Sequence, residues 1–253
     1  MKNLLLVVFI MFAFHAHSQK IFVLQPAIVD SKDVAKFEEN EVKYAQILAQ
    51  DAVEDGKLLQ WVLLKKVRSV GRTGGELSRG EKVNYMWVHV YESLEQMVNV
   101  DAWWQTEKKF GIPSQTVYGN FDRVNIGNFV YKLEKQILTK NSGKYFLFNW
   151  TFPNDLNKLL DVAKIETEKW SQDKLEKYGM TSWSMATRVY PQGKEYAPLF
   201  FVDVYQNLDQ VMKHLMGEAI LSEISPEGLK SMSTIMPQGW HERVLFEIVA
   251  GAK

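Results

Sequence analysis

The sequence has no cysteine among its 253 residues. Disulfides, thiolate metal sites and a cysteine nucleophile are therefore excluded, and the stability of the fold must come from packing. The sequence also lacks an excess of charge of either sign, because 30 basic residues balance 30 acidic ones. Nucleic-acid-binding proteins usually have a clear basic excess, so we expect no nucleic-acid partner.

Long apolar runs are absent after the first residues. The run from Leu4 to Phe14 follows the basic Lys2 and is shorter than the roughly 20 apolar residues that cross a bilayer. Ala16 and Ser18 supply small residues at the −3 and −1 positions of a cleavage site. This pattern predicts a secretory signal peptide over residues 1–18 and an exported protein, periplasmic or secreted, without stable membrane insertion. An uncleaved anchor is the alternative.

Metal ligands are also scarce. After the predicted signal peptide the only histidines are His89, His214 and His241, and no two of them have helical spacing. With no cysteine to complete a ligand set, we expect no metal site.

Three short patterns occur twice, in the same order. The clearest pair is "VHVYESLEQM" from Val88 and "VDVYQNLDQV" from Val202. The others are Trp61–Val67 with Trp183–Val189, and Gly119–Val124 with Gly239–Val244. Three repeats in register indicate an internal duplication.

Periodicity predicts the same order of elements in both copies: strand, helix, strand, strand, helix, strand. In the first copy these are Ile21–Ile28, Val34–Val53, Leu58–Arg68, Val83–Tyr91, Leu94–Phe110 and Val124–Lys132. In the second they are Tyr145–Phe152, Leu156–Tyr178, Thr181–Tyr190, Pro198–Tyr205, Leu208–Leu221 and Val244–Val249. Gly56 and Gly179 are predicted to end the first helices, and Ser93 and Asn207 to cap the second ones. The sequence thus predicts an α+β protein of two tandem ferredoxin-like units, residues 19–140 and 145–253, joined by a linker over 141–144.

This arrangement resembles the dimeric α+β barrel superfamily. The resemblance rests on the aromatic strands, the Glu-rich first helices and the entries to the second strands, Gly-Lys-Leu-x-x-Trp at Gly56 and Gly-Met-x-x-Trp at Gly179. Small exported α+β barrel proteins and NIPSNAP-like proteins are the most similar members. The resemblance implies that the two sheets pack face to face and enclose a barrel within one chain. The superfamily includes haem enzymes, cofactor-free monooxygenases, isomerases and binding proteins, so a fold is implied rather than one activity.

Strand alternation suggests which side chains line the barrel. We expect the aliphatic face of Met86, Val88 and Val90 to pack on helices. The opposite faces are expected inside, and they consist of Trp87, His89 and Tyr91 in the first copy and Phe201, Asp203 and Tyr205 in the second. His89 and Asp203 occupy equivalent positions, so the pair is a candidate general base oriented by an acid. The alternative is that His89 is a hydrogen-bonded wall residue.

Four more polar residues recur in equivalent places. Gln25 and Asn149 lie on the first strands, where a buried amide needs a partner such as a polar ligand, water or backbone. Arg123 and Arg243 each follow an acid at the start of the last strand. They are interpreted as structural ion pairs, with an anion-binding role as the alternative.

The remaining features predict less. The loop Val70–Lys82 contains glycines and arginines without the spacing of a phosphate-binding loop, so we expect a hairpin loop or a one-sided lid. Trp103 and Trp104 are expected to form core or interface. His214 is the one helical histidine that could be an axial haem ligand, but a lone helical histidine is usually satisfied by the protein, so we expect no cofactor, haem included.

Three functions stay open from the sequence. The first is binding of a small apolar or aromatic molecule between the two sheets. The second is a cofactor-free monooxygenase or isomerase that uses His89 and Asp203. The third is a structural protein with a filled barrel. A small-molecule ligand and a homo-oligomer are the partners that the sequence allows.

Overall fold

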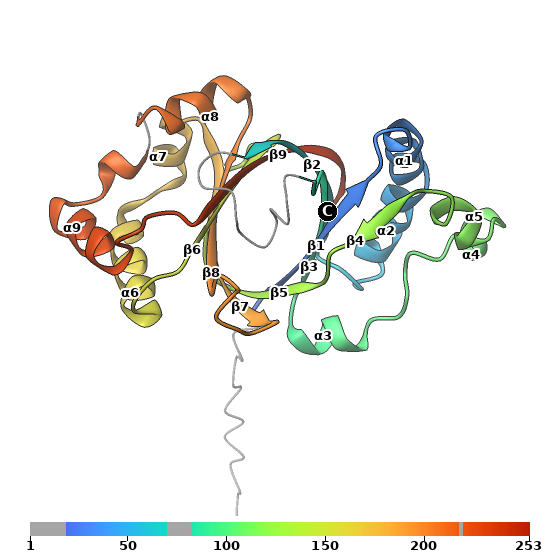
Figure 1. The fold of residues 1–253 in the computed structure, drawn as a ribbon, viewed down its shortest axis with the longest axis horizontal. Helices are drawn as coiled ribbons and strands as arrows, with labels where there is room; N and C mark the ends of the chain where they lie inside the picture. Colours follow the sequence, from blue (N-terminus) through green and yellow to red (C-terminus); the bar gives the residue numbers. More distant parts are fainter. Residues whose placement is uncertain (1–18, 70–81, 218–219) are drawn as a thin grey trace, which may run out of the picture.

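The computed structural model describes residues 19–69, 82–217 and 220–253. The predicted signal peptide and residues 70–81 of the predicted loop lie outside the described residues. Within them, the chain has a mixed α+β fold in which eight antiparallel strands close into a barrel and the helices pack outside it in two groups (Figure 1). The expectation of an α+β barrel is confirmed.

The barrel is closed by strands from both halves of the chain. Its strands are β1 (Ile21–Val29), β2 (Gln60–Ser69), β3 (Tyr85–Tyr91), β5 (Phe129–Leu138), β6 (Tyr145–Thr151), β7 (Met180–Tyr190), β8 (Leu199–Tyr205) and β9 (Glu242–Ala252). The order around the ring is β3-β2-β9-β6-β8-β7-β5-β1, and β1 pairs again with β3. The β2–β9 and β5–β7 pairings therefore join the two halves.

One predicted strand is split in two. β4 (Arg123–Asn125) and β5 pair one after the other with β1, at Ala27–Val29 and at Ile21–Leu24 respectively. The three residues between them are not strand, and Gly127 has φ +155°, a backbone conformation that favours glycine. The interruption leaves β4 paired with β1 as a short strand outside the closed ring.

The helices of the first half differ in part from the prediction. α1 (Val34–Asn40), the π-helical segment η1 (Glu41–Ala45) and α2 (Gln46–Glu54) form one run, as predicted. The predicted second helix is instead broken into α3 (Leu94–Asn99), α4 (Glu107–Phe110) and α5 (Ser114–Tyr118). The predicted caps are present, because Ser93 accepts a hydrogen bond from the Gln96 backbone N–H at 3.1 Å and Gly56 has φ +69°.

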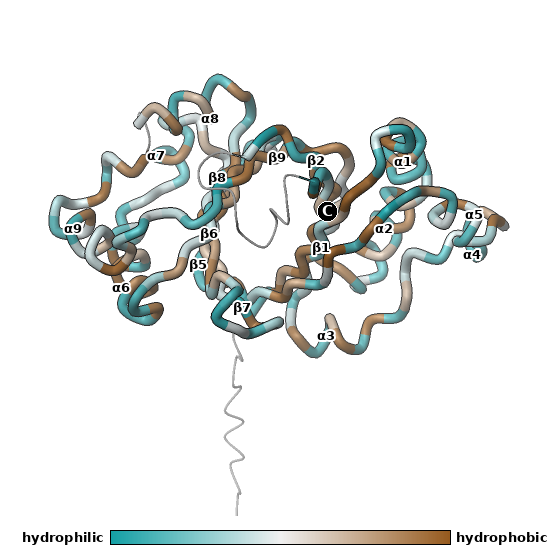
Figure 2. Tube along the Cα trace, viewed as in Figure 1, coloured by the Kyte–Doolittle hydropathy of each residue, from teal (hydrophilic) through white to brown (hydrophobic). Residues whose placement is uncertain are grey.

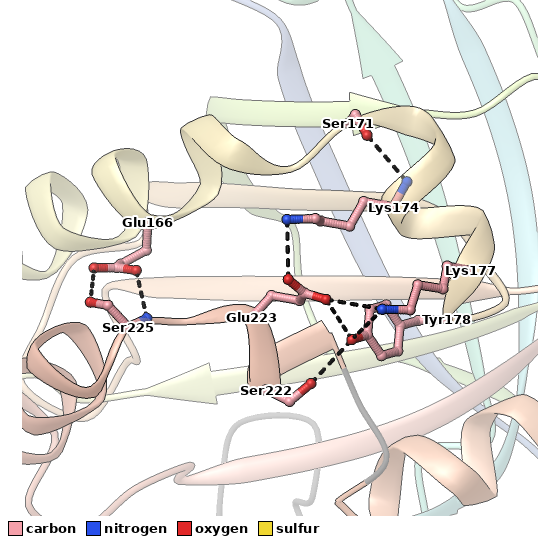
Figure 3. Close-up of polar contacts among 8 residues, drawn as sticks. All are labelled: Glu166, Ser171, Lys174, Lys177, Tyr178, Ser222, Glu223 and Ser225. Carbon is pink, nitrogen blue, oxygen red and sulfur yellow. Dashed lines mark hydrogen bonds and ion pairs between the residues drawn. The ribbon is translucent and has the colours of Figure 1, made fainter.

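The second half carries one helix that periodicity missed. Its helical elements are α6 (Leu156–Glu166), η3 (Thr167–Lys169), α7 (Gln172–Lys177), α8 (Leu208–Leu215), η4 (Ile220–Glu223) and α9 (Pro226–Ile235), of which α9 was not predicted. Figure 3 shows how polar contacts fix it: Glu166 accepts hydrogen bonds from the backbone N–H and the hydroxyl of Ser225 at 2.9 and 2.7 Å. Nearby, Glu223 pairs with Lys174 and Lys177 and accepts a hydrogen bond from Tyr178 (Figure 3).

Three apolar cores result. One lies inside the barrel, and the other two lie between the outer face of the barrel and each group of helices. In Figure 2 hydrophobic residues concentrate along the strands, while hydrophilic residues alternate along the surrounding helices. No helix in the described part of the chain is long and apolar enough to cross a bilayer.

The assignment of faces to the strands was wrong. Met86, Val88 and Val90 point into the barrel, whereas Trp87 and Tyr91 belong to the core under the helices. Both faces are apolar, so alternation separates them without showing which one is inside. Large rings occupy both sides of the barrel wall, since Tyr131 and Trp150 lie in the barrel core and Trp61 in the core under the helices, so side-chain size does not identify the inner face either.

The two ends of the barrel are packed differently. At one end the guanidinium of Arg188 lies over the rings of Phe129, Tyr131 and Tyr196, at 5.1, 4.7 and 5.3 Å from their centroids. Arg188 Nε also donates to the Ala197 carbonyl at 2.8 Å. Toward the other end the interior holds a cavity of about 440 Å³. The barrel is therefore only partly filled.

Candidate functional site

A pocket of about 550 Å³ lies outside the barrel, between the first-half strands and their helices. We call it the helix-side pocket. Its walls come from β1, β2 and β3, from η1 and from the segment that follows α3. Five residues predicted as site residues line it: Gln25, Trp87, His89, Tyr91 and Arg123. The structure thus brings these five together, although Trp87, His89 and Tyr91 lie outside the barrel and not inside it as expected.

Glu41 is the buried acid of this pocket. Its residue is 3% exposed, and Oε2 accepts a hydrogen bond from Trp87 Nε1 at 2.9 Å. Burial raises the pKa of Glu41 to about 7, against the opposing effects of the Trp87 hydrogen bond and the positive charge of Arg123. Glu41 begins the π-helical segment, and such segments are frequent at functional sites. The adjacent Asn40 fixes this turn by donating to the Val117 carbonyl at 2.7 Å.

His89 is the second titratable group in the pocket. Its ring meets Trp103 edge to face at 5.7 Å between centroids and lies 6.5 Å from the ring of Tyr91. Burial lowers the pKa of His89 to about 4, so the imidazole is neutral at neutral pH. Within the described parts of the chain no hydrogen bond holds this ring. A neutral imidazole can donate from one nitrogen and accept at the other.

Two further polar atoms of the pocket have no partner among the described residues. They are Trp103 Nε1 and the Tyr118 hydroxyl, and both are buried. Burial, followed by the nearby charge of Glu41, raises the pKa of Tyr118. The Trp103 indole N–H lies near Tyr91 and opposes the rise of the Tyr91 pKa that burial causes, but the two form no hydrogen bond of normal geometry. Native proteins rarely leave buried polar atoms unpaired, so these atoms suggest an external partner.

Arg123 and Gln25 complete the polar side of the pocket. The predicted ion pair between Arg123 and the preceding acid is not present, because Asp122 pairs with Lys32. The Arg123 guanidinium lies 5.1 Å from the centroid of the Trp87 ring. Gln25 Nε2 donates to Asn128 Oδ1 at 2.7 Å, which gives its amide a protein partner.

The equivalent positions of the second half form a closed network. Asn149 Nδ2 donates to Asp203 Oδ2 at 2.8 Å, and Asn149 Oδ1 accepts from Arg243 Nε at 2.7 Å. His214 lies between Tyr205 and Arg243, with Nδ1 at 2.6 Å from the Tyr205 hydroxyl and Nε2 at 3.3 Å from an Arg243 nitrogen. All but Arg243 are buried, and within this network the side chains satisfy one another.

The predicted pairing of His89 with Asp203 is therefore wrong. His89 lies in the first-half pocket, whereas Asp203 contacts Asn149 and lies 3.8 Å from His214 Nε2 in the second-half core. Burial raises the pKa of Asp203 and lowers that of His214. The two strands carry these residues on the outer face of the barrel, so the barrel wall separates them. Phe201 likewise packs in the second core, against Trp183 and Trp240 at 5.9 and 5.4 Å.

Sequence reasoning missed Glu41 and Tyr118. A signal for Glu41 was present, because it stands between Phe37 and Ala45 at four-residue spacing and so lies on the buried face of its helix. An acid at such a position is unusual. Tyr118 gave no comparable signal, since it lies in α5, where no helix was predicted.

No family model matches the chain, and no curated protein matches it. Solved structures do match. A "Putative monooxygenase" from Fusobacterium nucleatum aligns with a TM-score of 0.59 and 10% identity, over 94% of this chain and 95% of that one. A "putative monooxygenase" from Lactobacillus acidophilus aligns with a TM-score of 0.55 and 12% identity, over 93% and 96%. The chain shares the α+β barrel fold of these proteins.

One expectation is corrected by these comparisons. The absence of a cofactor, haem included, was expected from the histidines alone. The matching structures include a chlorite dismutase from Candidatus Nitrospira defluvii in complex with cyanide, at a TM-score of 0.47, 7% identity and 90% coverage of both chains. The expectation is therefore withdrawn. In the described part of the chain, no three His, Cys, Asp or Glu side chains come together as a metal site.

Proposed function

We propose that the protein binds a small, planar, largely apolar molecule with one hydrogen-bonding group in the helix-side pocket. The observation that carries this proposal is the contrast between the halves. In the second half Asn149 closes on Asp203 and Arg243, while in the first-half pocket the ring of His89, Trp103 Nε1 and the Tyr118 hydroxyl have no hydrogen-bond partner among the described residues.

The walls of the pocket favour an aromatic ligand. Trp61, Trp87, Tyr91, Trp103 and Trp104 line it, and such rings bind flat apolar molecules by stacked or edge-to-face contacts. Trp104 is 51% exposed, so this wall reaches the surface. A pocket with apolar walls and few converging polar groups is typical of small-molecule sites.

The polar groups define the ligand further. The neutral imidazole of His89 and the indole N–H of Trp103 suit a hydroxyl or carbonyl group. Pairing with the ligand would relieve the cost of burying an unpaired donor, which is about 1–3 kcal/mol for each group. A phenol or a ring ketone has this combination of properties.

A second candidate function is catalysis, either oxygenation or isomerisation. It is supported by the pKa of Glu41 of about 7, which leaves the carboxylate part ionised and part protonated at neutral pH, as a general base requires. In this proposal Glu41 replaces the pair of His89 and Asp203 as the base and removes a proton from the bound molecule. Arg123, whose charge already acts on Glu41, would stabilise the anion that forms. The fold shared with two structures named as monooxygenases is compatible with this chemistry.

We further propose that residues 19–140 and 145–253 are two fused ferredoxin-like units joined by the linker over 141–144, and that the chain is an exported protein related to the NIPSNAP-like group. The duplicated sequence supports the two units. So do the pairings, since the β1–β3 and β2–β3 pairs recur as β6–β8 and β7–β8. Export is supported by the apolar run at Leu4–Phe14.

Calorimetric titration with 2-naphthol tests the proposed function. Binding should weaken at least tenfold in Trp103→Ala, with Asp203→Asn as the matched control in the second half. Glu41→Gln separates the two candidates, because a binding protein keeps most of its affinity whereas an enzyme loses its turnover of any substrate found. If Trp103→Ala folds and binds 2-naphthol as the wild type does, the ligand site is elsewhere.

A further inference from the structure

The barrel interior contains a second cavity, separate from the helix-side pocket. The two lie on opposite faces of the same strand, because Val88 and Val90 line the interior cavity while His89 lines the helix-side pocket. The interior cavity has a volume of about 440 Å³, which is within the range of roughly 300–1,000 Å³ of small-molecule sites. It is rimmed by the segment from Leu138 to Gly143 and by the last residues of β9.

On two opposite strands the inward-facing side chains become smaller toward this rim. Along β3 they run Met86, Val88, Val90, and along β8 they run Phe200, Val202, Val204. Val88 and Val202 each stay 8% exposed although they lie in the barrel core, so open space reaches them. The walls are apolar, formed by aliphatic side chains and by the rings of Phe22, Phe146, Phe148 and Phe200.

One wall and the rim are polar. Gln136 Nε2 donates to Ser184 Oγ at 3.1 Å on the β5–β7 wall, so both groups are satisfied without a ligand. At the rim, Lys253 Nζ donates to Ser142 Oγ at 3.1 Å. Lys140 belongs to the same rim segment as Ser142 and also lines the cavity. Lysine is the only charged side chain among the described residues that line the cavity.

From this geometry we propose that the interior cavity binds an amphiphile with a slender aliphatic chain and an anionic head group, such as a medium-chain fatty acid. The chain lies against Val62, Val88 and Val202, where burial of methylene groups is favourable. The carboxylate stays at the rim, where Lys140 and the hydroxyl and amide groups hydrogen-bond it and water solvates it. This site is independent of the aromatic ligand proposed for the helix-side pocket.

A series of fatty acids of increasing length tests the proposal, by calorimetry on the protein without its predicted signal peptide. Octanoate, decanoate and dodecanoate should bind one per chain, and each added methylene should tighten binding up to roughly fourfold until the cavity is full. Binding should show a negative heat-capacity change, the mark of buried apolar surface. Equal affinity across the series, or no binding at millimolar concentration, overturns the proposal.

Variants locate the site. Val88→Phe and Val202→Phe fill the cavity from opposite walls and should each weaken decanoate binding at least tenfold, while Trp103→Ala in the helix-side pocket should leave it unchanged. The reverse pattern would contradict the proposal. If both filling variants fail to fold, methyl NMR of the wild type decides: decanoate must shift the methyl signals of Val62, Val88 and Val202, and shifts confined to other residues overturn the assignment.

The head group has its own control. Decanoate should bind several-fold more tightly than decanol, and Lys140→Gln should remove that difference without weakening decanol. Equal affinities of decanoate and decanol for the wild type would show that the rim does not recognise an anion, and would overturn that part of the proposal.

Discussion

The carboxylate of Glu41 accepts a hydrogen bond from the indole N–H of Trp87 at 2.9 Å. This contact joins the π-helical turn to β3 across the layer between helices and sheet. It also holds an acid in a place where burial raises its pKa to about 7. The chemistry proposed for the helix-side pocket depends on this acid and on the neutral His89, which lines the same pocket.

The pH dependence of stability should report the ionisation of Glu41. The pKa of Glu41 is about 7 in the folded protein and 4.5 as its ordinary value, so between these values the folded state binds more protons than the unfolded state. Its contribution to the free energy of unfolding therefore falls as pH rises from about 4.5 to 7. Glu41→Gln removes that contribution and should be more stable than the wild type above pH 7, by about 1–3 kcal/mol. Urea unfolding from pH 4 to 8 measures this. Parallel profiles for the two proteins would contradict it.

His89 should contribute with the opposite sign. The pKa of His89 is about 4 when folded, against 6.5 as its ordinary value, so between these values the unfolded state binds more protons. The stability contributed by the neutral imidazole is complete above about pH 6.5 and is lost as pH falls toward 4. In the wild type the contributions of His89 and Glu41 partly cancel. His89→Gln should therefore show a steeper loss of stability on raising the pH from 4.5 to 7. A profile that stays as flat as that of the wild type would argue against the buried neutral ring.

Asn149 and Gln25 offer a matched comparison of the two halves. Asn149→Ala removes one partner from Asp203 and one from Arg243 in a buried network, so it should lower the free energy of unfolding by roughly 2–4 kcal/mol. Gln25→Ala removes only the exposed contact with Asn128 and should cost less than about 1 kcal/mol. Denaturant unfolding at pH 7 tests both. Equal losses in the free energy of unfolding would mean that the polar groups at these two positions are equally well paired, which would contradict the contrast between the halves.

Arg188 should stabilise the packed end of the barrel through its contacts with three rings. Arg188→Lys loses the planar guanidinium and should cost about 1–2 kcal/mol. A double-mutant cycle with Phe129→Leu isolates the contact, and its coupling energy should be about 0.5–1.5 kcal/mol. A coupling energy of zero would leave Arg188 without a role in packing this end.

Much of the fold was predictable from local patterns. Strand positions followed from β-branched and aromatic runs, and the caps Ser93 and Asn207 accept the expected backbone hydrogen bonds at 3.1 Å. The helix α9 was missed because its apolar residues are few and spaced by serine and glycine. The broken helix after Ser93 was missed because α4 and α5 are short turns whose position depends on tertiary contacts such as the bond from Ser114 to Glu107.

The candidate site was predictable in its residues more than in its location. Gln25, Trp87, His89, Tyr91 and Arg123 do meet in one pocket. Alternation showed that Trp87, His89 and Tyr91 share a face of β3, yet it could not show whether that face lies inside the barrel. The pairing with Asp203 failed for this reason, since outward faces of two strands in different halves do not meet.

The helix-side pocket of the first half is the proposed site of an aromatic ligand. An NMR titration of the ¹⁵N-labelled protein with 2-naphthol, read at the tryptophan indole signals, tests this most directly. Saturable shifts of the Trp87 and Trp103 indole N–H signals are predicted, with those of Trp170 and Trp183 in the second-half core unchanged. Shifts confined to Trp170, Trp183 or the barrel residue Trp150 would contradict the account.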